Sequence, residues 1–399
     1  MIRLIRRRTL AEAIVLLALL SVPIGAQQIS DQTGWELNGL PVINYDSDEG
    51  FGYGGMFEAY NYGEEGLTPY RFTLQPRVFL TTKGRRDFTL FFDAPYLLSD
   101  GWRVDGSLGS ERQIASPYYG PGNTSVYDKA LEHLDGQYYY RFGRTRTNAT
   151  MNLQRRMGGL PLRVLIGGGA THTSIDLLPK DAIRTLLSQD LLGGDVPEGW
   201  SNHLRVGLVW DTRDRETGPR RGTWSELLVQ AVPDFLGSES QYVRWTFVDR
   251  RYFPLGDGLT FANRFLVQNI EGSAPFYDLF IVQTSFKQEE GLGGAKTLRG
   301  IPKNRYMGRG LFLWNTELRW RAHDFTMAGR SFHLVFSGFV DTGRVWDPAL
   351  VAGQILSNLQ TAFGIGVRVG VGENFIAAVD VGHSVQATAP MYIGLGYLY

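Results

Sequence analysis

The chain has 399 residues, with 40 Lys and Arg against 40 Asp and Glu, and it contains no cysteine. This length admits one large domain or two ordinary ones. The balanced charge gives no field that would favour nucleic acid, and the lack of cysteine excludes disulfides, thiolate metal sites and a lipid-modified cysteine. The 49 glycines and 13% aromatic residues, without long apolar runs, are typical of many strands joined by turns.

The first 26 residues have the organisation of a cleavable signal peptide. Four arginines within the first eight residues precede an apolar stretch over 13–20 and a small-residue end at Ala26. The apolar stretch is too short for a stop-transfer helix, and an uncleaved membrane anchor is the alternative. The rest of the chain has no run of about 18 apolar residues. We therefore expect an exported protein without a transmembrane helix.

Residues 27–50 are predicted to form a short periplasmic lead-in, and residues 51–399 to form a barrel. From residue 51 onward, alternating segments of about 9–14 residues follow one another, long enough to cross a bilayer when tilted. The pattern predicts an all-β fold, a 16-stranded antiparallel transmembrane β-barrel, and bacterial single-chain barrels have an even number of strands. The expected strands are 51–62, 69–82, 86–97, 101–113, 134–143, 146–157, 161–176, 201–213, 222–234, 240–253, 258–269, 310–321, 332–344, 361–370, 374–383 and 390–399.

The connections between these strands can be assigned to the two sides of the membrane by parity. If both chain ends are periplasmic, the long segments 177–200 and 270–309 lie outside, where barrels carry long loops. One helix is expected, over 181–192, within the first of them. The long connection 114–133 falls on the periplasmic side, against the general trend. The short connections also fall there: 82–86, 157–161 and 253–258.

The stretch 291–321 joins a glycine-rich loop to an amphipathic strand. Because side chains alternate along a strand, one face of this strand is aromatic and aliphatic and the other polar. A barrel would turn the apolar face to lipid and the polar face to a wet lumen, whereas a soluble sheet would bury the apolar face. The expected apolar face is Phe312, Trp314, Thr316, Leu318 and Trp320, and the expected lumenal face is Asn315, Glu317, Arg319 and Arg321.

The C-terminal segment ends in an aromatic-x-aromatic pattern. Met391, Ile393, Leu395, Tyr397 and Tyr399 are expected to share one face of the last strand. The two tyrosines would then lie at the height of an aromatic girdle. An ordinary final strand of a soluble sheet is the alternative.

Three ordered motifs carry a family resemblance. The first is Leu298-Arg299-Gly300, followed by Asn315-x-Glu317-Leu318-Arg319 and Phe339-Val340-Asp341-x-Gly343. The second is Trp210-Asp211-Thr212-Arg213-Asp214 with Pro219-Arg220-Arg221-Gly222, and the third is the C-terminal signature with Gly394, Tyr397 and Tyr399. Over about residues 40–399, the chain resembles the C-terminal barrel of the BamA/TamA outer-membrane assembly superfamily, also described as a bacterial surface-antigen domain.

The resemblance implies roles for these residues. The long sixth loop would fold into the lumen and clamp Arg299, next to Gly300, against Glu317 and Asp341. A buried guanidinium keeps its charge and pairs well with carboxylates. The C-terminal signature would be the signal that barrel-assembly machinery recognises during insertion. The family's hairpin motif, which precedes its ninth strand, corresponds here to Asp211, Arg213, Asp214 and Gly222.

The resemblance also implies a function in outer-membrane biogenesis, or in moving a protein or lipid through a lateral seam between the first and last strands. Residues 27–50 are too few for a POTRA domain, the periplasmic module that captures clients in the family. A short family member of this kind would have outer-membrane lipid and the assembly machinery as partners, with a periplasmic partner or client protein still to be identified.

Three alternatives stay open from the sequence. A passive, porin-like channel requires that 270–309 leave the lumen free. A barrel enzyme requires a cluster of titratable residues with shifted pKa at one mouth, and no Ser–His motif is recognisable. A soluble β-sandwich is the alternative at the level of fold. Neither the glycine-rich 291–297 nor the six scattered histidines matches a nucleotide or metal motif, so no cofactor is expected.

Overall fold

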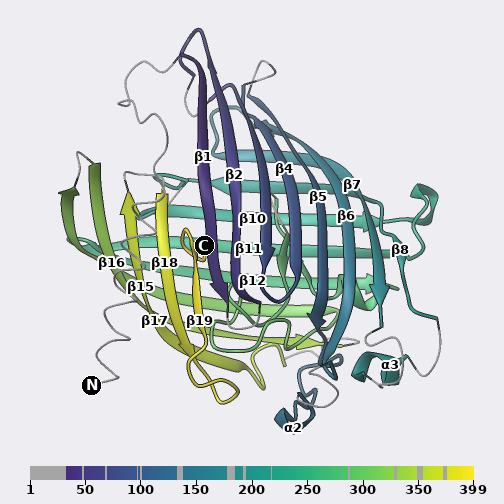
Figure 1. Ribbon diagram of the computed structural model, residues 1–399. Coiled ribbons are helices and arrows are strands. Elements are labelled where there is room, and N and C mark those ends of the chain that lie inside the picture. Colours follow the sequence, from purple (N-terminus) through teal and green to yellow (C-terminus); the bar gives the residue numbers. More distant parts are fainter. Residues whose placement is uncertain are drawn as a thin grey trace, which may run out of the picture.

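The protein forms a closed antiparallel β-barrel of sixteen long strands, in which β1 pairs with both β2 and β19 (Figure 1). The expected fold class is therefore confirmed. The structure is a computed structural model that describes residues 33–46, 49–67, 70–96, 98, 101–132, 138–177, 185–191, 195–216, 218–285, 288–327, 330–347, 354–371 and 375–399. The expected signal peptide, residues 1–26, lies outside the described residues.

The long strands run mostly in sequence order around the barrel. They are β1 Gly34–Asp46, β2 Gly50–Gly63, β3 Phe72–Thr81, β4 Arg85–Ala94, β5 Trp102–Pro117, β6 Arg141–Arg156, β7 Leu162–Asp176, β9 His203–Asp211, β10 Gly222–Val232, β11 Tyr242–Gly256, β12 Leu259–Gly272, β15 Gly310–Met327, β16 Arg330–Trp346, β17 Gln360–Val371, β18 Phe375–His383 and β19 Met391–Leu395. The two-residue β8 Gly199–Trp200 adds to β7, and β13 Ile281–Gln283 pairs with β14 Gln288–Glu290 apart from the barrel wall.

Two strand assignments from the sequence are wrong, and they cancel in the count. Residues 34–46, assigned to the periplasmic lead-in, form β1 and pair with β2 over their whole length. The strands expected over 134–143 and 146–157 are not separate, because residues 141–156 form one continuous strand, β6, preceded by a turn at 138–140; residues 134–137 lie outside the described residues. The reason is that Gly143 and the polar residues after it resemble a turn, but β6 pairs with both neighbours through them.

The shift by one strand also changes the two ends of the barrel. Neighbouring strands run in opposite directions, so the connections 118–140, 177–202 and 273–309 all lie at one end, which is the lower end in Figure 1. The segment 114–133, expected on the opposite side, therefore belongs with the other long loops. The turn at 82–84 also lies at this end, whereas 157–161 and the turn after β11 lie at the other.

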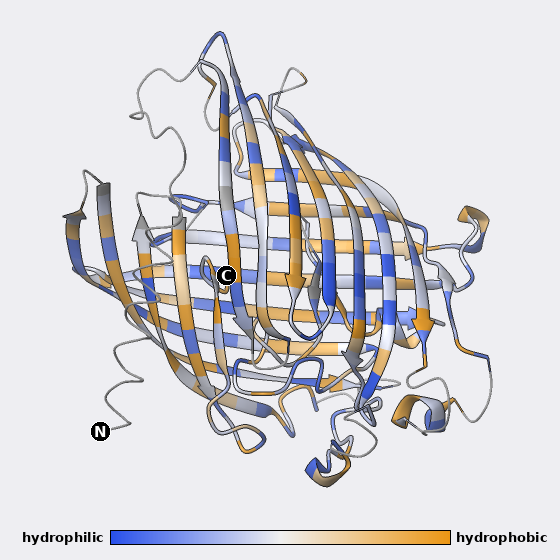
Figure 2. Cartoon of the chain, in the orientation of Figure 1, coloured by the Kyte–Doolittle hydropathy of each residue, from blue (hydrophilic) through white to orange (hydrophobic). Residues whose placement is uncertain are grey.

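Side chains alternate between an outer and an inner face of the wall, and the hydropathy of successive residues alternates along many of the strands in Figure 2. On β15, Trp314, Leu318 and Trp320 are exposed on the outside, while Asn315 and Glu317 are fully buried on the inside. The prediction for this strand is thus confirmed at most positions. Phe312 is the exception, since it is 1% exposed and packs edge-on against Phe265 at a ring distance of 5.4 Å.

The helices among the described residues are short. Of the helix expected over 181–192, the structure describes 185–191, where α3, Leu186–Asp190, is capped by the Thr185 hydroxyl, which accepts from the Ser188 N–H. Residues 181–184 and 192 lie outside the described residues. The other described helices are α2 Lys129–Glu132 and the 3-10 turns η2 Asp234–Leu236 and η3 Phe276–Asp278. Among the described residues, none of the helices has the length and apolarity needed to cross a membrane.

Candidate functional site

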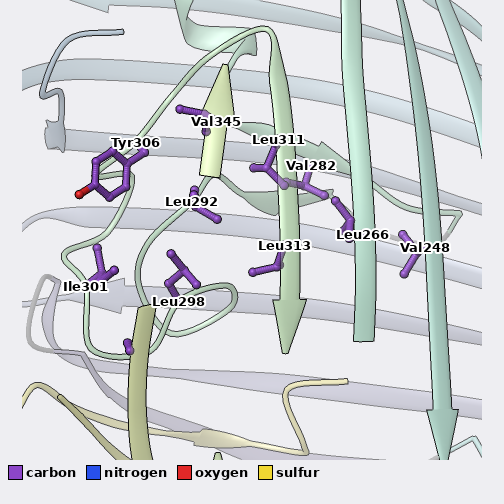
Figure 3. Packing of buried hydrophobic residues seen from close by; sticks show 11 residues of the cluster. Val248, Leu266, Val282, Leu292, Leu298, Ile301, Tyr306, Leu311, Leu313 and Val345 are labelled. Atoms are coloured by element: carbon purple, nitrogen blue, oxygen red, sulfur yellow. The ribbon is translucent and has the colours of Figure 1, made fainter. Parts of the chain in front are cut away.

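The connection between β12 and β15 packs against side chains of the inner barrel wall. Leu292, Leu298 and Ile301 come from this connection and are almost completely buried (Figure 3). They share one apolar cluster with residues from six elements: Val248, Leu266, Val282, Leu311, Leu313, Val345 and Ala362. Apolar burial of this kind stabilises a segment in place, because each buried Leu or Ile contributes about 1.5–3 kcal/mol.

Arg299 is fully buried and lies at the centre of an almost completely buried ion-pair cluster. Its Nε and Nη2 donate to the two carboxylate oxygens of Asp341 at 2.9 and 3.0 Å, a bidentate geometry. Its Nη1 donates to Glu317 and to Asp380, each at 3.3 Å. The guanidinium also lies 3.5 Å from the centroid of the Phe339 ring, a cation–π geometry. The sequence thus named two of the three carboxylates around Arg299.

Arg368 and Asp380, which the sequence analysis did not name, complete the cluster together with Arg319. Arg368 on β17 contacts Glu317 at 3.2 Å and Asp380, on β18, at 3.1 Å. Arg319 contacts Glu317 at 3.4 Å. Three arginines therefore face three carboxylates, so the formal charges of the cluster balance. A signal was present, because Arg368 and Asp380 are single charges inside otherwise apolar strands.

Gly300 is required by its conformation and by space. Its φ is 116°, a value that side chains rarely permit. A Cβ there would lie 2.9 Å from the backbone nitrogen of His383. The Gly300 N–H donates to the Tyr392 hydroxyl at 3.3 Å, and its carbonyl accepts from Ser384 at 2.6 Å. The loop is therefore held against β18, β19 and the turn between them.

The four residues assigned to the hairpin motif lie in and beside the connection from β9 to β10. The Arg213 guanidinium donates to both oxygens of Asp211, at 2.9 and 3.1 Å, and lies over the Trp224 ring. Asp214 accepts from the backbone N–H of Arg220 at 3.0 Å. A Cβ on Gly222, at φ 97°, would lie 2.2 Å from the Thr212 carbonyl oxygen. These contacts form a rigid turn ahead of the ninth long strand.

The C-terminal residues do not continue the last strand. β19 ends at Leu395, and Gly396, with φ 79°, redirects the chain inward. Tyr399 is buried, and its hydroxyl donates to the carbonyls of Ala262 and Asn315 at 3.0 and 3.2 Å. The expectation that Tyr397 and Tyr399 face outward at girdle height is wrong, because the positive φ at Gly396 ends the alternation.

A second charge cluster ties the same connection to the other side of the barrel. Lys303 contacts Glu49, in the turn from β1 to β2, and Glu290. Arg85 contacts Glu49 at 3.1 Å and Glu111 at 2.9 Å. Burial by itself would raise the pKa of Glu49, but the charges of Lys303 and Arg85 outweigh it and lower the pKa to about 2. Burial likewise opposes the charge of Lys303, and Glu290 and Glu49 overcome it and raise its pKa.

Family comparison agrees with this architecture. The model of the Omp85 superfamily domain matches residues 74–376. The chain belongs to the Omp85 superfamily. The resemblance stated from its motifs is thereby confirmed, and an Omp85 β-barrel indicates a location in the bacterial outer membrane. No curated protein matches the chain by sequence.

Solved structures show which Omp85 barrels the fold is similar to. BamA from Haemophilus ducreyi lacking POTRA domains 1-3 has a TM-score of 0.59 at 15% identity, over 92% of this chain and 71% of that chain. CdiB from Escherichia coli has a TM-score of 0.59 at 14% identity, over 92% of this chain and 64% of that chain. CdiB from Acinetobacter baumannii has a TM-score of 0.51 at 15% identity, over 92% and 60%. The chain thus spans less than two thirds of either CdiB chain, and identities this low establish the fold alone.

Proposed function

We propose that this Omp85 barrel acts in outer-membrane biogenesis, or moves a protein or lipid across that membrane, by opening a lateral seam between β1 and β19. The observation that carries the proposal is the pairing of these strands. They share two residue pairs, Tyr45 with Ile393 and Asp46 with Tyr392. β1 and β2, by comparison, share thirteen pairs. The seam is the weakest junction between two long strands of the described barrel wall.

The short pairing leaves most of β1 as an edge strand. Its residues from Gly34 to Asn44 have no partner on β19 in the described register. Unpaired backbone N–H and C=O groups at such an edge can pair with an incoming strand. Pro41 fits this edge position, since proline lacks the N–H that a central strand donates on both sides. An edge of this kind supports a role in templating a client strand.

The connection between β12 and β15 links the two sides of this seam. Arg299 and Gly300 contact β16, β18 and Tyr392 of β19, and Lys303 contacts Glu49 beside β1. The segment 299–303 therefore joins the last strands to the first hairpin through charged contacts. We infer that it acts as a latch, called here the seam latch, whose release accompanies opening. The passive channel is less well supported, because this connection packs against the inner wall.

The partners that this function requires follow the same reasoning. Outer-membrane lipid would meet the exposed edge of β1, and a client protein would supply the pairing strand. The barrel-assembly machinery would act during insertion of the chain itself, with Gly394, Tyr397 and Tyr399 as its recognition signal. A periplasmic partner that delivers the client is part of the same proposal.

A disulfide across the seam tests the proposal directly, because the natural chain has no cysteine. Tyr45→Cys combined with Ile393→Cys places two thiols at paired positions of β1 and β19. Such pairs are close enough for a disulfide. We expect the reduced variant in liposomes to accelerate the folding of an unfolded outer-membrane protein. Oxidation should abolish this acceleration, and a reductant should restore it.

The matched control keeps one cysteine and moves the other. Val379→Cys with Ile393→Cys pairs β18 with β19 within the wall and leaves the seam free. Oxidation of this control should leave the activity unchanged. The seam mechanism would be rejected if the Tyr45–Ile393 variant forms its disulfide completely and still works at the rate of the reduced protein.

A further inference from the structure

A small basic cavity lies at the barrel end where β1 begins and β19 ends. Its volume is about 40 Å³, and its lining includes five residues that carry or can carry positive charge: Arg215, Arg220, Arg319, Arg321 and His333. The charges come from three places, the turn before β10, the end of β15 and the start of β16. Tyr397 of the inward-turned C-terminal segment closes one side.

The charge in this cavity is not balanced by its own lining. Among the described residues that line it, none is Asp or Glu. Carboxylates outside the cavity contact three of its arginines: Glu317 contacts Arg319 at 3.4 Å, Asp324 contacts Arg321 at 2.6 Å and Asp214 contacts Arg215 at 3.8 Å. A concave site lined by one sign of charge attracts counter-ions. The cavity therefore has the electrostatics of an anion site.

Two of the arginines have donors to spare. Arg319 is 2% exposed, and its Nη1 has no hydrogen-bond acceptor among the described residues. Its Glu317 partner is shared with Arg299 and Arg368. The Arg220 side chain makes no ion pair with any residue that the structure describes. A buried guanidinium N–H without an acceptor is costly, and an oxyanion would supply several acceptors at once.

We propose that this cavity binds a phosphate group through Arg220, Arg319 and Arg321. The volume admits one tetrahedral oxyanion, since a single water needs about 10–15 Å³, and it is far below the roughly 300 Å³ of sites for larger ligands. Arginine suits phosphate because its planar fork donates two parallel hydrogen bonds. The phosphate could be free in solution or belong to the headgroup of a lipid at the barrel rim. The proposed phosphate site does not depend on the seam mechanism.

The test is a calorimetric titration of the full-length barrel with inorganic phosphate in a maltoside detergent, which carries no phosphate group. Sodium chloride at matched ionic strength separates binding from screening. We expect saturable binding of phosphate to the natural protein. The double variant Arg220→Gln with Arg321→Gln should bind phosphate at least about tenfold more weakly, since the loss of a charged hydrogen bond changes the affinity by about this factor. The lysine pair, R220K with R321K, should retain part of the affinity.

The control variant is Arg251→Gln, which removes a 58% exposed arginine paired with Asp249. It should bind phosphate like the natural protein. Nanodiscs with phosphatidylglycerol identify the source of the phosphate. If this lipid competes with inorganic phosphate for the natural protein, the site binds a lipid headgroup. If the lipid does not compete, the site binds free phosphate. The proposal is overturned if no saturable binding occurs, or if the folded glutamine pair binds as tightly as the natural protein.

Discussion

Arg299 shows how one residue can organise a loop inside a barrel. It is fully buried, and its three carboxylate partners come from β15, β16 and β18. Asp341 depends on it most, because its other described side-chain contact is with the Asn315 amide, at 2.7 Å. Removing the only counter-charge of a buried charge is strongly destabilising, whereas a complete buried ion-pair cluster can contribute close to zero to the free energy of folding.

The first prediction follows from this dependence. Arg299→Ala should destabilise the barrel by about 3–5 kcal/mol, because Asp341 would be left buried and uncompensated. Asp341→Asn should cost a similar amount, and the double variant less than the sum, since the two residues form one bidentate pair. The measurement is urea unfolding scored by the heat-modifiable band on a gel.

The matched control for this prediction is Arg309→Ala in the same connection. Arg309 is 39% exposed and pairs with Asp347 at 3.5 Å, so its removal should cost about 0–1 kcal/mol. Equal effects of the two alanine variants, or strict additivity of Arg299→Ala and Asp341→Asn, would contradict the buried pair.

At the scale of residues, the sequence predicted the clamp only in part. Glu317 and Asp341 could be named because they stand in motifs close to Arg299. Arg368 and Asp380 stand out as single charges in their strands, but the sequence did not connect them to Arg299, because they are 69 and 81 positions away and reach Arg299 and Glu317 only when β17 and β18 complete the wall. The inward turn of Tyr399 was missed for a local reason, since alternation assumes that φ stays negative through Gly396.

At the scale of elements, the main error concerned β1. Its sequence contains Gly34, Gly39 and Pro41, which signal turns, and its apolar residues do not alternate cleanly. It is a strand because β2 pairs with it over thirteen positions, which is a long-range effect that local propensity does not contain. The residues that weakened the prediction are the ones that fit an edge strand beside a seam.

The seam latch gives a prediction about pH. The pKa of Glu49 is about 2 in the folded barrel, below its ordinary value of 4.5, because Lys303 and Arg85 oppose the effect of burial. A carboxylate with a lowered pKa contributes stability above its ordinary pKa and loses it as the pH falls towards the folded value. Glu49→Gln should therefore lower the urea midpoint at pH 7, and the difference from the natural protein should shrink below about pH 4.5.

The control for the pH series is Glu65→Gln, which changes an exposed residue at the opposite end of the barrel. Its urea midpoint should follow that of the natural protein at every pH. A Glu49→Gln difference that stays constant from pH 7 down to about 3 would show that the latch charges do not contribute through this ionisation.

At the scale of the whole molecule, the inner and outer surfaces of the barrel have opposite polarity. The inner surface carries the ion-pair clusters and the packed connection, and the outer surface carries exposed apolar side chains on most of the long strands. A soluble protein with so much exposed apolar surface would aggregate, so the outer surface requires lipid. The alternation was predictable because it is a property of each strand taken alone, whereas the strand count was right only because two wrong assignments cancelled.

The last prediction uses this outer surface. Ile365 is 70% exposed in the middle of β17, and Leu356 is 61% exposed in the connection before it. Ile365→Arg should destabilise the barrel in phospholipid vesicles by about 2–4 kcal/mol, because an arginine on the lipid face near the midplane is costly. Leu356→Arg should cost about 0–1 kcal/mol, since it would stay outside the hydrocarbon.

Urea titrations in vesicles measure both variants, and Ile365→Ala accounts for the loss of the side chain itself. The penalty of Ile365→Arg beyond Ile365→Ala should decrease when the vesicles are replaced by a short-chain detergent, because a thinner apolar layer lets the guanidinium reach water. Equal and small costs for Ile365→Arg and Leu356→Arg in vesicles would mean that β17 does not face lipid. This result would also contradict the seam proposal, since a strand can pass sideways into the bilayer only from a wall that borders the bilayer.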